Sequence, residues 1–461
     1  MGGRETLKDV SDGAGGEPGG EPVPGIVLVF SRDRPLSIPI RVGARAVDVG
    51  RDLIAELDGD ERLSRRHATL ALEAGRLRIA DCGSRNGTLV DGAPLRESRV
   101  LAAPAVLRMG QSLFLTVDDV RPFETEPVHA SADGVVGPAL AKAFRRVDLV
   151  ARTSDTLLIL GESGTGKELA ARRFHQGSPR ASGPFVAVNC ATIPEGIAER
   201  LLFGARRGAY SGATADADGY LVTAHRGTLF LDELAELDPA VQPKLLRVLE
   251  TREVVPLGDT RGRAVDVGLC AATLRDIPER VAQGRFREDL YYRMGRPAVR
   301  LPPLRQRREE IPFLIQRALA AVGPELDADA ALVEMCLLRP WPGNVRELIG
   351  EVRRAGHTAR DQGRDRVDRL DLGTAAGMHL GGLTMPPAVA TVHAGNGVAP
   401  ASAPTPAAPA GAADGGFPAR AAIEEMLRAE GGNVTRAAQR LGLHRNQLRR
   451  WLARNDVDPS A

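Results

Sequence analysis

At the centre of the chain stands the sequence Gly161-Glu162-Ser163-Gly164-Thr165-Gly166-Lys167-Glu168. It follows an apolar run, Leu157 to Leu160, and precedes a segment of helical composition, so the expected order is strand, loop and helix. Closely spaced glycines let successive backbone amides converge on one anion, and the following helix N-terminus adds its positive dipole. With Lys167 available for the outer phosphates, the loop predicts a site for a nucleoside triphosphate.

The residue after the lysine departs from the usual phosphate loop. A serine or threonine hydroxyl normally stands there and binds magnesium, whereas this chain has Glu168. A bound metal must therefore depend more on other groups. The alternative interpretation is a glycine-rich turn in which the lysine is incidental.

Length and composition set wide limits. A chain of 461 residues suggests about three domains, and a net charge of only +2 means that any basic surface must be local. Four cysteines are scattered without paired spacing, which favours neither a zinc site nor a disulfide framework. No apolar run approaches the ~20 residues that span a bilayer, and the first residues contain no apolar signal core. We therefore expect a cytoplasmic protein without a membrane segment.

The first third of the chain predicts a tail, an all-β domain and a linker. Residues 1–24 are rich in Gly, Glu and Pro and are expected to be disordered. Residues 25–120 contain many short alternating apolar segments between turn signals, which is typical of a β-sandwich. Residues 121–134 lack periodicity and are expected to be a linker. The expected strands are Ile26–Phe30, Ile38–Val42, Ala46–Val49, Ala68–Leu72, Leu77–Ile79, Thr88–Val90, Val106–Leu107 and Leu113–Val117.

The loops of this β domain carry a recurring set of basic and polar side chains. Its three parts are Gly50-Arg51, Ser64-Arg65-Arg66-His67 and Asp81-Cys82-Gly83-Ser84-Arg85-Asn86-Gly87-Thr88. Together they resemble the forkhead-associated (FHA) domain, a reader of phosphothreonine peptides. Arginine forks, a hydroxyl and amide donors on rigid loops suit a phosphate group. The alternative is a solvated basic rim beside a tight Asn-Gly turn.

The FHA resemblance assigns individual roles. It implies that Arg51, Ser64 and Arg65 contact the phosphate, that Asn86 contacts the peptide backbone and that His67 braces the loop. The partner would be a phosphothreonine protein or a Ser/Thr kinase.

Residues 135–375 alternate between apolar strand-like runs and helical segments, which indicates a parallel sheet flanked by helices. One apolar run, Thr228 to Leu231, ends in Asp232 and Glu233. Such a strand places one acid near magnesium and the next near the attacking water, so Asp232 is the expected Mg²⁺ ligand and Glu233 the expected catalytic acid. Paired acids are also common on solvated surfaces.

Further segments of this domain complete a family pattern. They are Val188-Asn189-Cys190, Phe286-Arg287-Glu288-Asp289-Leu290-Tyr291-Tyr292-Arg293 and Trp341-Pro342-Gly343-Asn344-Val345-Arg346-Glu347-Leu348. With the phosphate loop, they closely resemble the AAA+ domain of bacterial enhancer-binding proteins, the activators of sigma-54 RNA polymerase. The resemblance implies an ATPase in which Asn189 switches Glu233 and Arg346 lies over the nucleotide. It also implies that Arg287 and Arg293 are arginine fingers acting on a neighbouring subunit, which requires a ring, usually a hexamer.

A shorter segment points to sigma-54 itself. It reads Gly208-Ala209-Tyr210-Ser211-Gly212-Ala213, where the family has Gly-Ala-Phe-Thr-Gly-Ala in the loop that pushes on sigma-54. Glycines on both sides permit a mobile hairpin, and an aromatic tip supplies a compact apolar contact. An ordinary surface loop is the alternative.

The sequence departs from the family at three positions. Ser211 replaces a threonine, keeping the hydroxyl and losing the methyl, and Arg226 replaces a common glycine. Leu274 stands where a polar sensor residue is usual and cannot hydrogen-bond a phosphate or water. Hydrolysis is therefore in more doubt than nucleotide binding, although Thr273 could substitute.

The end of the chain predicts a linker and a small helical domain. Residues 376–417 are dominated by Ala, Pro and Gly, which is typical of a flexible linker. Residues 418–457 contain three helical segments separated by glycines, and they resemble the Fis-type helix-turn-helix of the same family. The last helix would read bases and hold phosphates of DNA; a solvated basic helix in a small bundle is the alternative. Its expected DNA contacts are Arg445, Asn446, Gln447, Arg449 and Arg450.

The predicted protein is thus multidomain, with an all-β FHA sandwich, an α/β AAA+ domain with a helical lid, and an all-α helix-turn-helix. The expected function is a transcription activator that hydrolyses ATP to remodel the sigma-54 holoenzyme, binds upstream DNA and receives phosphothreonine signals. The rival is a DNA-bound phosphopeptide scaffold or repressor whose AAA+ domain binds ATP but hydrolyses little. Leu274 and Ser211 favour this rival.

Overall fold

The computed structural model of the protein describes residues 21–131, 134–194, 196–275 and 277–379, together with residues 423, 426, 427, 434–441 and 452. The chain divides into two compact units, Met1–Pro386 and Pro387–Ala461. Within the described ranges, no helix is both long and apolar enough to cross a bilayer.

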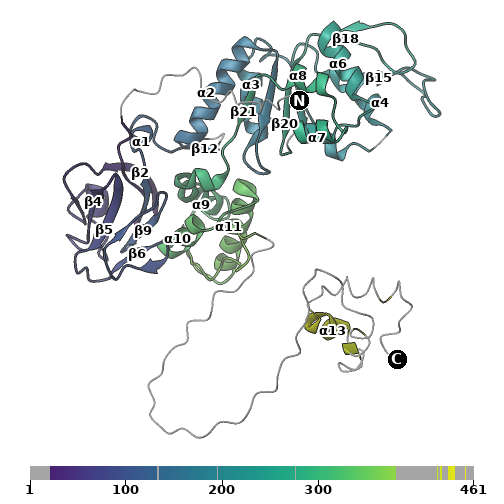
Figure 1. Ribbon diagram of the computed structural model, residues 1–461. Coiled ribbons are helices and arrows are strands. Elements are labelled where there is room, and N and C mark those ends of the chain that lie inside the picture. The colour runs from purple at the N-terminus through teal and green to yellow at the C-terminus, as the bar shows by residue number, and fades with distance from the viewer. Residues whose placement is uncertain are drawn as a thin grey trace, which may run out of the picture. The chain divides into compact units, whose positions relative to one another are not determined.

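The N-terminal domain is the predicted FHA sandwich of two antiparallel sheets (Figure 1). One sheet has the order β2-β1-β10-β9-β6-β7 and the other β3-β4-β5-β8. The eight expected strands are present, and two further short strands, β7 and β8, are exposed at the sheet edges. The elements are β1 (Gly25–Ser31), β2 (Arg34–Arg41), β3 (Val47–Val49), η1 (Ala55–Leu57), β4 (Ala68–Glu73), β5 (Arg76–Asp81), β6 (Thr88–Val90), β7 (Ala93–Pro94), β8 (Arg99–Val100), β9 (Val106–Met109) and β10 (Ser112–Val117).

The segment expected to be a plain linker carries regular structure. Helix α1 (Arg121–Thr125) packs beside β2, and β11 (His129–Ser131) pairs with β12 (Gly134–Val136). Pro122 stands in the first turn of α1, where its missing N–H costs nothing. The aperiodic sequence hid these elements because each is only three to five residues long.

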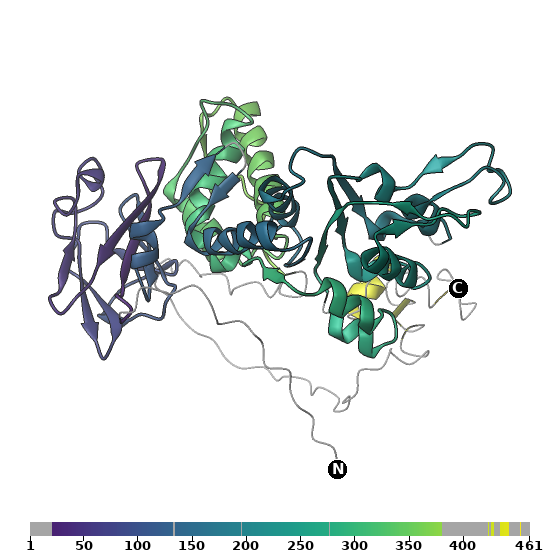
Figure 2. The same ribbon diagram turned by 90° about the horizontal axis from the view of Figure 1, so that it is seen from above.

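The second domain has a parallel five-stranded sheet of order β14-β17-β20-β13-β21, as the alternating sequence predicts (Figure 1, Figure 2). The central strands β13, β17 and β20 are buried on both faces along most of their length and are largely apolar, whereas the edge strands β14 and β21 are partly exposed. The elements of this core are α2 (Pro138–Thr153), β13 (Thr156–Leu160), α3 (Lys167–Gly177), β14 (Phe185–Asn189), η2 (Cys190–Thr192), α4 (Ala198–Phe203), β15 (Gly204–Ala205), β16 (Ala217–Asp218), α5 (Tyr220–Thr223), β17 (Thr228–Asp232), η3 (Leu234–Glu236), α6 (Gln242–Thr251), β18 (Glu253–Val254), β19 (Arg263–Ala264), β20 (Gly268–Thr273), α7 (Ile277–Ala282), α8 (Glu288–Met294) and β21 (Ala298–Arg300).

Alternate residues of the central strands enter two separate cores. Leu157 and Ile159 of β13 pack with helices α2 and α3, whereas Leu158 lies in the cluster formed with α4, α6 and α8. The strand register aligns Leu160 with Thr273 and Asn189 with Asp232. The carboxyl ends of these strands therefore share one edge of the sheet, which is where α/β proteins bind ligands.

A helical lid follows the sheet. Its elements are η4 (Leu304–Gln306), η5 (Arg308–Glu310), α9 (Ile311–Ala320), β22 (Asp327–Ala328), α10 (Ala330–Leu338), α11 (Asn344–Asp361) and β23 (Arg366–Val367). Asp329 caps α10 by accepting a hydrogen bond from the amide of Leu332 at 2.6 Å. Helices α9, α10 and α11 surround one apolar cluster that includes the fully buried Trp341.

In the C-terminal unit, the described residues agree with the expected bundle. Helix α13 (Val434–Arg440) is the second of the three expected helices, and residues 423, 426, 427 and 452 are also helical. Ile423, Leu427 and Leu452 are buried in one cluster, as their helical spacing predicts. The rest of the third helix, with Arg445, Asn446, Gln447, Arg449 and Arg450, lies outside the described residues, as do residues 1–20 and 380–422.

Candidate nucleotide site and phosphopeptide loops

The phosphate loop connects β13 to α3 as the sequence predicts. Gly164 and Gly166 have φ of 76° and 102°, a region that glycine reaches without strain. A Cβ atom at Gly164 would lie 2.3 Å from the carbonyl oxygen of Gly343 in the lid, so no side chain fits there. Lys167 begins α3. The loop and a helix N-terminus thus form a cradle for an anion.

Lys167 and the two acids of β17 meet at the carboxyl edge of the sheet. The ammonium Nζ of Lys167 donates to Oε1 of Glu233 and to the carbonyl of Gly161, both at 3.2 Å, and the lysine side chain is only 7% exposed. Burial raises the pKa of the Asp232 carboxyl, while the charge of Lys167 opposes this shift. The arrangement offers one cation and two carboxylates beside an anion cradle.

The carboxylate of Glu233 is also held by backbone. Its Oε2 accepts from the amide of Leu274 at 3.4 Å, and its own φ is 52°, in the left-handed region that costs a residue with a side chain about 1–2 kcal/mol. Strained backbone of this kind is typical of functional sites. The Leu274 side chain is 51% exposed, so the backbone at this position, and not the side chain, contacts the acid.

Two residues expected to assist Glu233 have other contacts. Asn189 lies beside Asp232 in the register of the sheet, but its Oδ1 accepts from the amide of Ala191 at 2.9 Å and caps η2. Thr273 is fully buried, and its hydroxyl accepts from the amide of Arg275 at 3.1 Å. In this structure Thr273 therefore holds the turn after β20.

The lid is fastened to the phosphate loop by Asn344, a residue for which the sequence alone predicts no role. Its Nδ2 donates to Oε2 of Glu162 at 3.1 Å and to the carbonyl of Ser163 at 3.0 Å, while its Oδ1 accepts from the amide of Leu304 at 2.8 Å. Arg346, expected over the nucleotide, donates to Oγ of Ser163 at 3.3 Å. The lid therefore contacts the site through these two neighbouring side chains.

Two arginines strengthen this fastening. Arg305 forks onto the Glu162 carboxylate at 2.7 and 2.8 Å. Arg307, 1% exposed, donates to the carbonyl of Thr165 at 2.8 Å and to Glu310 at 2.7 Å. Glu310 in turn accepts from the amide of Gly137 at 2.8 Å, ahead of α2. A buried arginine thus joins the phosphate loop, the lid and the first helix of the domain.

The two expected arginine fingers lie at the two ends of α8, Arg287 as its N-cap residue and Arg293 in its last turn. Arg287 precedes the helix and forks onto Asp289 at 2.7 and 3.0 Å with about half of its side chain exposed, 49%. Arg293 lies in the last turn and donates to the carbonyl of Leu249 at 3.2 Å. Both side chains belong to exposed residues and are open to a neighbouring molecule.

Among the described residues, no group of three or more His, Cys, Asp or Glu side chains converges as a ready metal site. Asp232 ends β17 at this edge of the sheet, beside Glu233, and its Oδ1 accepts from the amide of Glu233 at 3.0 Å. This donor set suits Mg²⁺, which binds through one or two carboxylates plus phosphate oxygens and water.

The loop expected to engage sigma-54 is closed at its base by the β15–β16 pair. The amide of Gly208 donates to the carbonyl of Ala213 at 2.9 Å, and Gly208 and Gly212 have φ of 80° and 96°. The Tyr210 hydroxyl accepts from Arg200 of α4 at 2.7 Å, and the guanidinium also lies over its ring at 5.1 Å. Tyr210 nevertheless remains 39% exposed. Its hydroxyl gives this loop a tether that the phenylalanine of the family pattern cannot form.

Another departure from the family pattern has a structural cost. Arg226 has φ of 60°, and its carbonyl closely faces Gly183. A glycine adopts this conformation without strain, whereas for an arginine the left-handed backbone conformation costs about 1–2 kcal/mol of stability.

A buried histidine joins two of the FHA loops. Nδ1 of His67 accepts from the amide of Ser64 at 3.1 Å, so the ring proton is on Nε2. Nε2 then donates to the carbonyl of Gly87, also at 3.1 Å. The His67 side chain is fully buried and joins two of the three loops. A Cβ atom at Gly50 would collide with the Arg65 carbonyl at 1.8 Å, which explains the glycine there.

The expected phosphate contacts gather on these braced loops. The amide of Arg51 donates to the carbonyl of Ser64 at 3.2 Å, and the Ser64 hydroxyl accepts from the amide of Arg85 at 3.3 Å. Asn86 donates to the carbonyl of Arg62 at 2.7 Å. In the described part of the chain, the Arg51 Nε atom is one of three buried polar side-chain atoms without a hydrogen-bond partner. An unpartnered guanidinium nitrogen is suited to an incoming anion.

Comparison with known proteins identifies the three domains. The chain matches the FHA domain over residues 45–110, the Sigma-54 interaction domain over residues 135–300 and the bacterial regulatory proteins of the Fis family over residues 420–454. This order of domains defines a regulator of transcription. The chain belongs to the family of sigma-54-dependent transcriptional activators.

Two relatives and one solved structure illustrate the similarity. The chain is 37% identical to the transcriptional regulatory protein ZraR of Klebsiella oxytoca over 70% of either chain. It is 42% identical to the nitric oxide reductase transcription regulator NorR2 of Cupriavidus necator over 68% of this chain and 61% of the relative. The crystal structure of NtrX from Brucella abortus in complex with ATP has 30% identity and a TM-score of 0.48, covering 68% of this chain and 67% of that one. The chain spans as little as 40% of other relatives, such as the Nif-specific regulatory protein of Rhizobium etli.

Proposed function

We propose that the AAA+ domain binds Mg-ATP and hydrolyses it to remodel sigma-54 RNA polymerase holoenzyme. The observation that carries this proposal is the meeting of Lys167, Asp232 and Glu233 at the sheet edge, under a lid fastened by Asn344. Lys167 and the phosphate loop amides would hold the outer phosphates, with residues 161–168 as the binding loop. Asp232 would hold Mg²⁺, which supplies charge neutralisation in phosphoryl transfer.

Turnover requires Glu233 to leave Lys167. In the proposed cycle the phosphates take over the lysine, and the freed carboxylate orients the attacking water. Asn189 pairs with Asp232 in the sheet register, next to Glu233 in the chain. From there Asn189 would control the release of Glu233 from Lys167. Arg346 would lie over the bound nucleotide, since it already reaches the phosphate loop at Ser163.

We further propose that the active form is a ring, with a hexamer as the expected stoichiometry. Arg287, just before α8, and Arg293, in its last turn, are exposed, and each has its local partners outside the phosphate loop. An arginine finger from a neighbour meets the charge that develops in the transition state and can contribute about 10³–10⁵ in rate. Residues 208–213 would carry the resulting movement to sigma-54.

The C-terminal unit is proposed to bind upstream DNA through residues 445–450. Arg449→Ala and Arg450→Ala should weaken binding and lower its salt dependence, by nearly one unit of slope for each lost phosphate contact. Asn446→Ala or Gln447→Ala should instead relax sequence preference. A footprint unaltered by all four changes would contradict the assignment. Because DNA and sigma-54 RNA polymerase are the proposed partners, the proposed site of action is the cytoplasm.

The FHA loops are proposed to bind a phosphothreonine peptide from a Ser/Thr kinase or one of its substrates. The support is the unpartnered Nε of Arg51 on a loop braced by His67. Arg51, Ser64 and Arg65 would contact the phosphate and Asn86 the peptide backbone. Calorimetry of the full chain with a phosphothreonine peptide library should detect binding that the unphosphorylated library lacks. Arg51→Ala should remove this binding, whereas Arg78→Ala, at an exposed Arg78–Glu73 pair elsewhere in the domain, should retain it.

One observation favours a second candidate. The exposed Leu274 side chain offers no polar atom to a phosphate or water, so the domain could bind ATP and turn it over too slowly to drive sigma-54. The protein would then act as a DNA-bound phosphopeptide scaffold or repressor. Transcription from a sigma-54 promoter in a purified system distinguishes the candidates, because only the activator produces ATP-dependent transcript.

A further inference from the structure

The large sheet of the FHA sandwich is apolar on both faces. In β1, Ile26 and Leu28 point into the core of the sandwich, while Val27 and Val29 belong to the cluster that contains the AAA+ lid. Strand β10 behaves in the same way, with Phe114 inside and its neighbours outside. One face of an antiparallel sheet usually meets water, so a second apolar face requires a partner.

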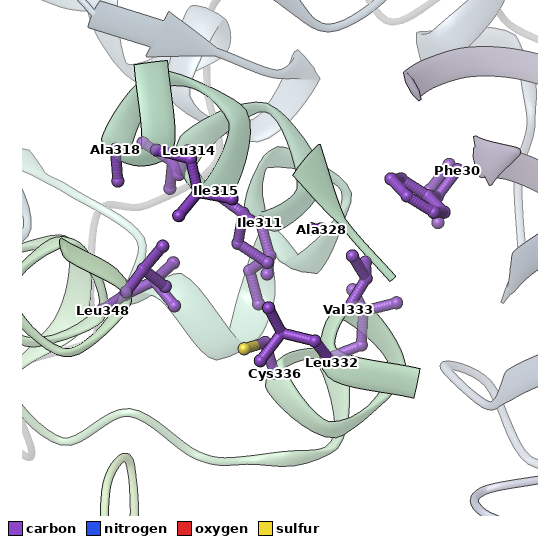
Figure 3. Packing of buried hydrophobic residues seen from close by; sticks show 14 of the residues in the cluster. Phe30, Ile311, Leu314, Ile315, Ala318, Ala328, Leu332, Val333, Cys336 and Leu348 are labelled. Carbon is purple, nitrogen blue, oxygen red and sulfur yellow. The ribbon is translucent and has the colours of Figure 1, made fainter. Parts of the chain in front are cut away.

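The lid is that partner. Val29 and Phe30 are at most 2% exposed and share one buried cluster with Ile311 of α9 and with Leu332 and Val333 of α10. Figure 3 draws Phe30 on the side of the cluster that faces α10. Because removal of apolar surface from water is the main favourable contribution to association, these buried aliphatic side chains hold the sheet against the lid.

Polar contacts fix the position of the sheet on the lid. The guanidinium of Arg108 in β9 contacts Oε2 of Glu334 in α10 at 3.0 Å, with the glutamate side chain 8% exposed. The other oxygen of Glu334 is buried and, among the described residues, lacks a hydrogen-bond partner. Arg108 is therefore the main compensation for a buried carboxylate, a situation in which loss of one partner is costly. A second pair joins Asp33 to Arg366 beside β23.

A continuous set of hydrogen bonds runs from the phosphopeptide loop toward this ion pair. Asn86 donates to the carbonyl of Arg62, and the amide of Arg62 donates to Asp60 at 3.0 Å. Asp60 is 1% exposed and accepts from the amide of Gln111 at 2.7 Å, in the turn between β9 and β10.

The same turn reaches the ion pair. Arg108 donates through Nε to the carbonyl of Gly110 at 3.3 Å and through Nη1 to Glu334. A Cβ atom at Gly110 would lie 2.8 Å from Asp60, so the turn fits closely against this acid. On its other side the lid touches the phosphate loop, where the amide of Val345 donates to the carbonyl of Gly164 at 3.1 Å.

We propose that the FHA sandwich and the lid form one rigid body, through which occupancy of the phosphothreonine site changes the affinity for nucleotide. This proposal rests on the proposed function for the identity of the two ligands. The lid contacts both domains that carry the two sites. On one side Asn344 and Arg346 contact the phosphate loop, and on the other the FHA sheet covers the lid. Because coupling of binding is reciprocal, nucleotide must change peptide affinity by the same factor.

The test uses the full chain and a fluorescent ATP analogue, so it needs no knowledge of the peptide. Arg108→Glu places two carboxylates together in the FHA–lid contact and should change the dissociation constant of the analogue at least fivefold, within the usual range of allosteric coupling. The charge swap Arg108→Glu with Glu334→Arg should restore it to within about twofold. Arg78→Glu, which breaks the exposed pair with Glu73 in the same domain, is the matched control and should leave the affinity unchanged.

Two further readouts separate the possible outcomes. Hydrogen exchange should increase in α9 and α10 of Arg108→Glu and return to the original rate in the swap. If Arg108→Glu does not fold, Glu334→Gln keeps the shape of the side chain and should still raise exchange in α10. Nucleotide affinity that is unchanged in Arg108→Glu despite faster exchange would overturn the coupling, and unchanged exchange would overturn the rigid contact. If the analogue responds as expected while no phosphothreonine peptide binds, the proposed peptide function fails and the mechanical coupling stands.

Discussion

The Nζ atom of Lys167 lies 3.2 Å from Oε1 of Glu233. The acid expected to orient water is therefore bound to the cation expected to bind phosphate. Nucleotide must displace Glu233 from Lys167 before the acid can act, so this ion pair couples binding to activation of the site.

Removing the charge of Glu233 should tighten nucleotide binding. Glu233→Gln removes both the competition for Lys167 and the repulsion of the phosphates, and we expect a gain of roughly three- to tenfold in ATP affinity, equal to ~0.7–1.4 kcal/mol. Equilibrium binding of a fluorescent ATP analogue measures this. Asp232→Asn is the control, because it should weaken the Mg²⁺-dependent part of binding. Weaker binding by Glu233→Gln would mean that the pair supports the nucleotide cradle.

If the arginine fingers act between subunits, two inactive variants should recover ATPase activity when they are mixed. Glu233→Ala and Arg293→Ala should each be nearly inactive, because one lacks the water-orienting acid and the other lacks the finger. In a mixed ring, an intact Glu233 can face an intact Arg293 of its neighbour, so activity should reappear. Steady-state turnover across mixing ratios checks this prediction. Mixtures as inactive as the separate variants would place Arg293 outside the site of the neighbour.

The tether on the sigma-54 loop should be removable without damage to the ATPase. Tyr210→Phe deletes the hydroxyl that accepts from Arg200 at 2.7 Å, a bond worth up to about 1 kcal/mol. We expect faster hydrogen exchange in residues 206–213 with ATP turnover unchanged. Tyr292→Phe, which removes a hydroxyl from another exposed tyrosine, is the control. Equal exchange in the two variants would indicate that the tether does not restrain the loop.

The folded state should lose stability as pH rises because of Glu309. Burial raises the pKa of this carboxyl to about 8, from an ordinary value of 4.5. The folded protein therefore holds a proton that the unfolded chain releases, and stability falls by about 1.4 kcal/mol per pH unit between these two values. Glu309→Gln is neutral at every pH, so its advantage in thermal stability should grow from pH 5 to pH 8. A constant difference between the variants would show that Glu309 is already ionised when folded.

Much of the fold was predictable because the signals were local. Many short apolar segments between turn signals predicted the sandwich, and continuous apolar runs predicted the parallel strands, including β17 with the two acids at its end. Strands β7 and β8 have no apolar pattern that marks them, because both are two residues long and exposed.

The site was predictable only in part, because some contacts depend on tertiary structure. The phosphate loop and the β17 acids carry a motif, whereas the clamp made by Arg305 and Arg307 joins segments more than 140 residues apart. The apolar second face of β1 was visible in Ile26 to Phe30, but its partner on the lid lies some 300 residues later in the chain. Such pairings have no local signal.

ATP turnover as a function of protein concentration tests the central claim most directly. The account predicts that the wild-type chain hydrolyses ATP with a specific rate that rises with concentration, as rings form and neighbouring arginines complete the sites. Glu233→Ala should bind ATP without this turnover, and Leu274→Asn should increase the wild-type rate by restoring a polar side chain beside the acid. A wild-type rate no higher than that of Glu233→Ala at every concentration would contradict the activator and leave the phosphopeptide scaffold in its place.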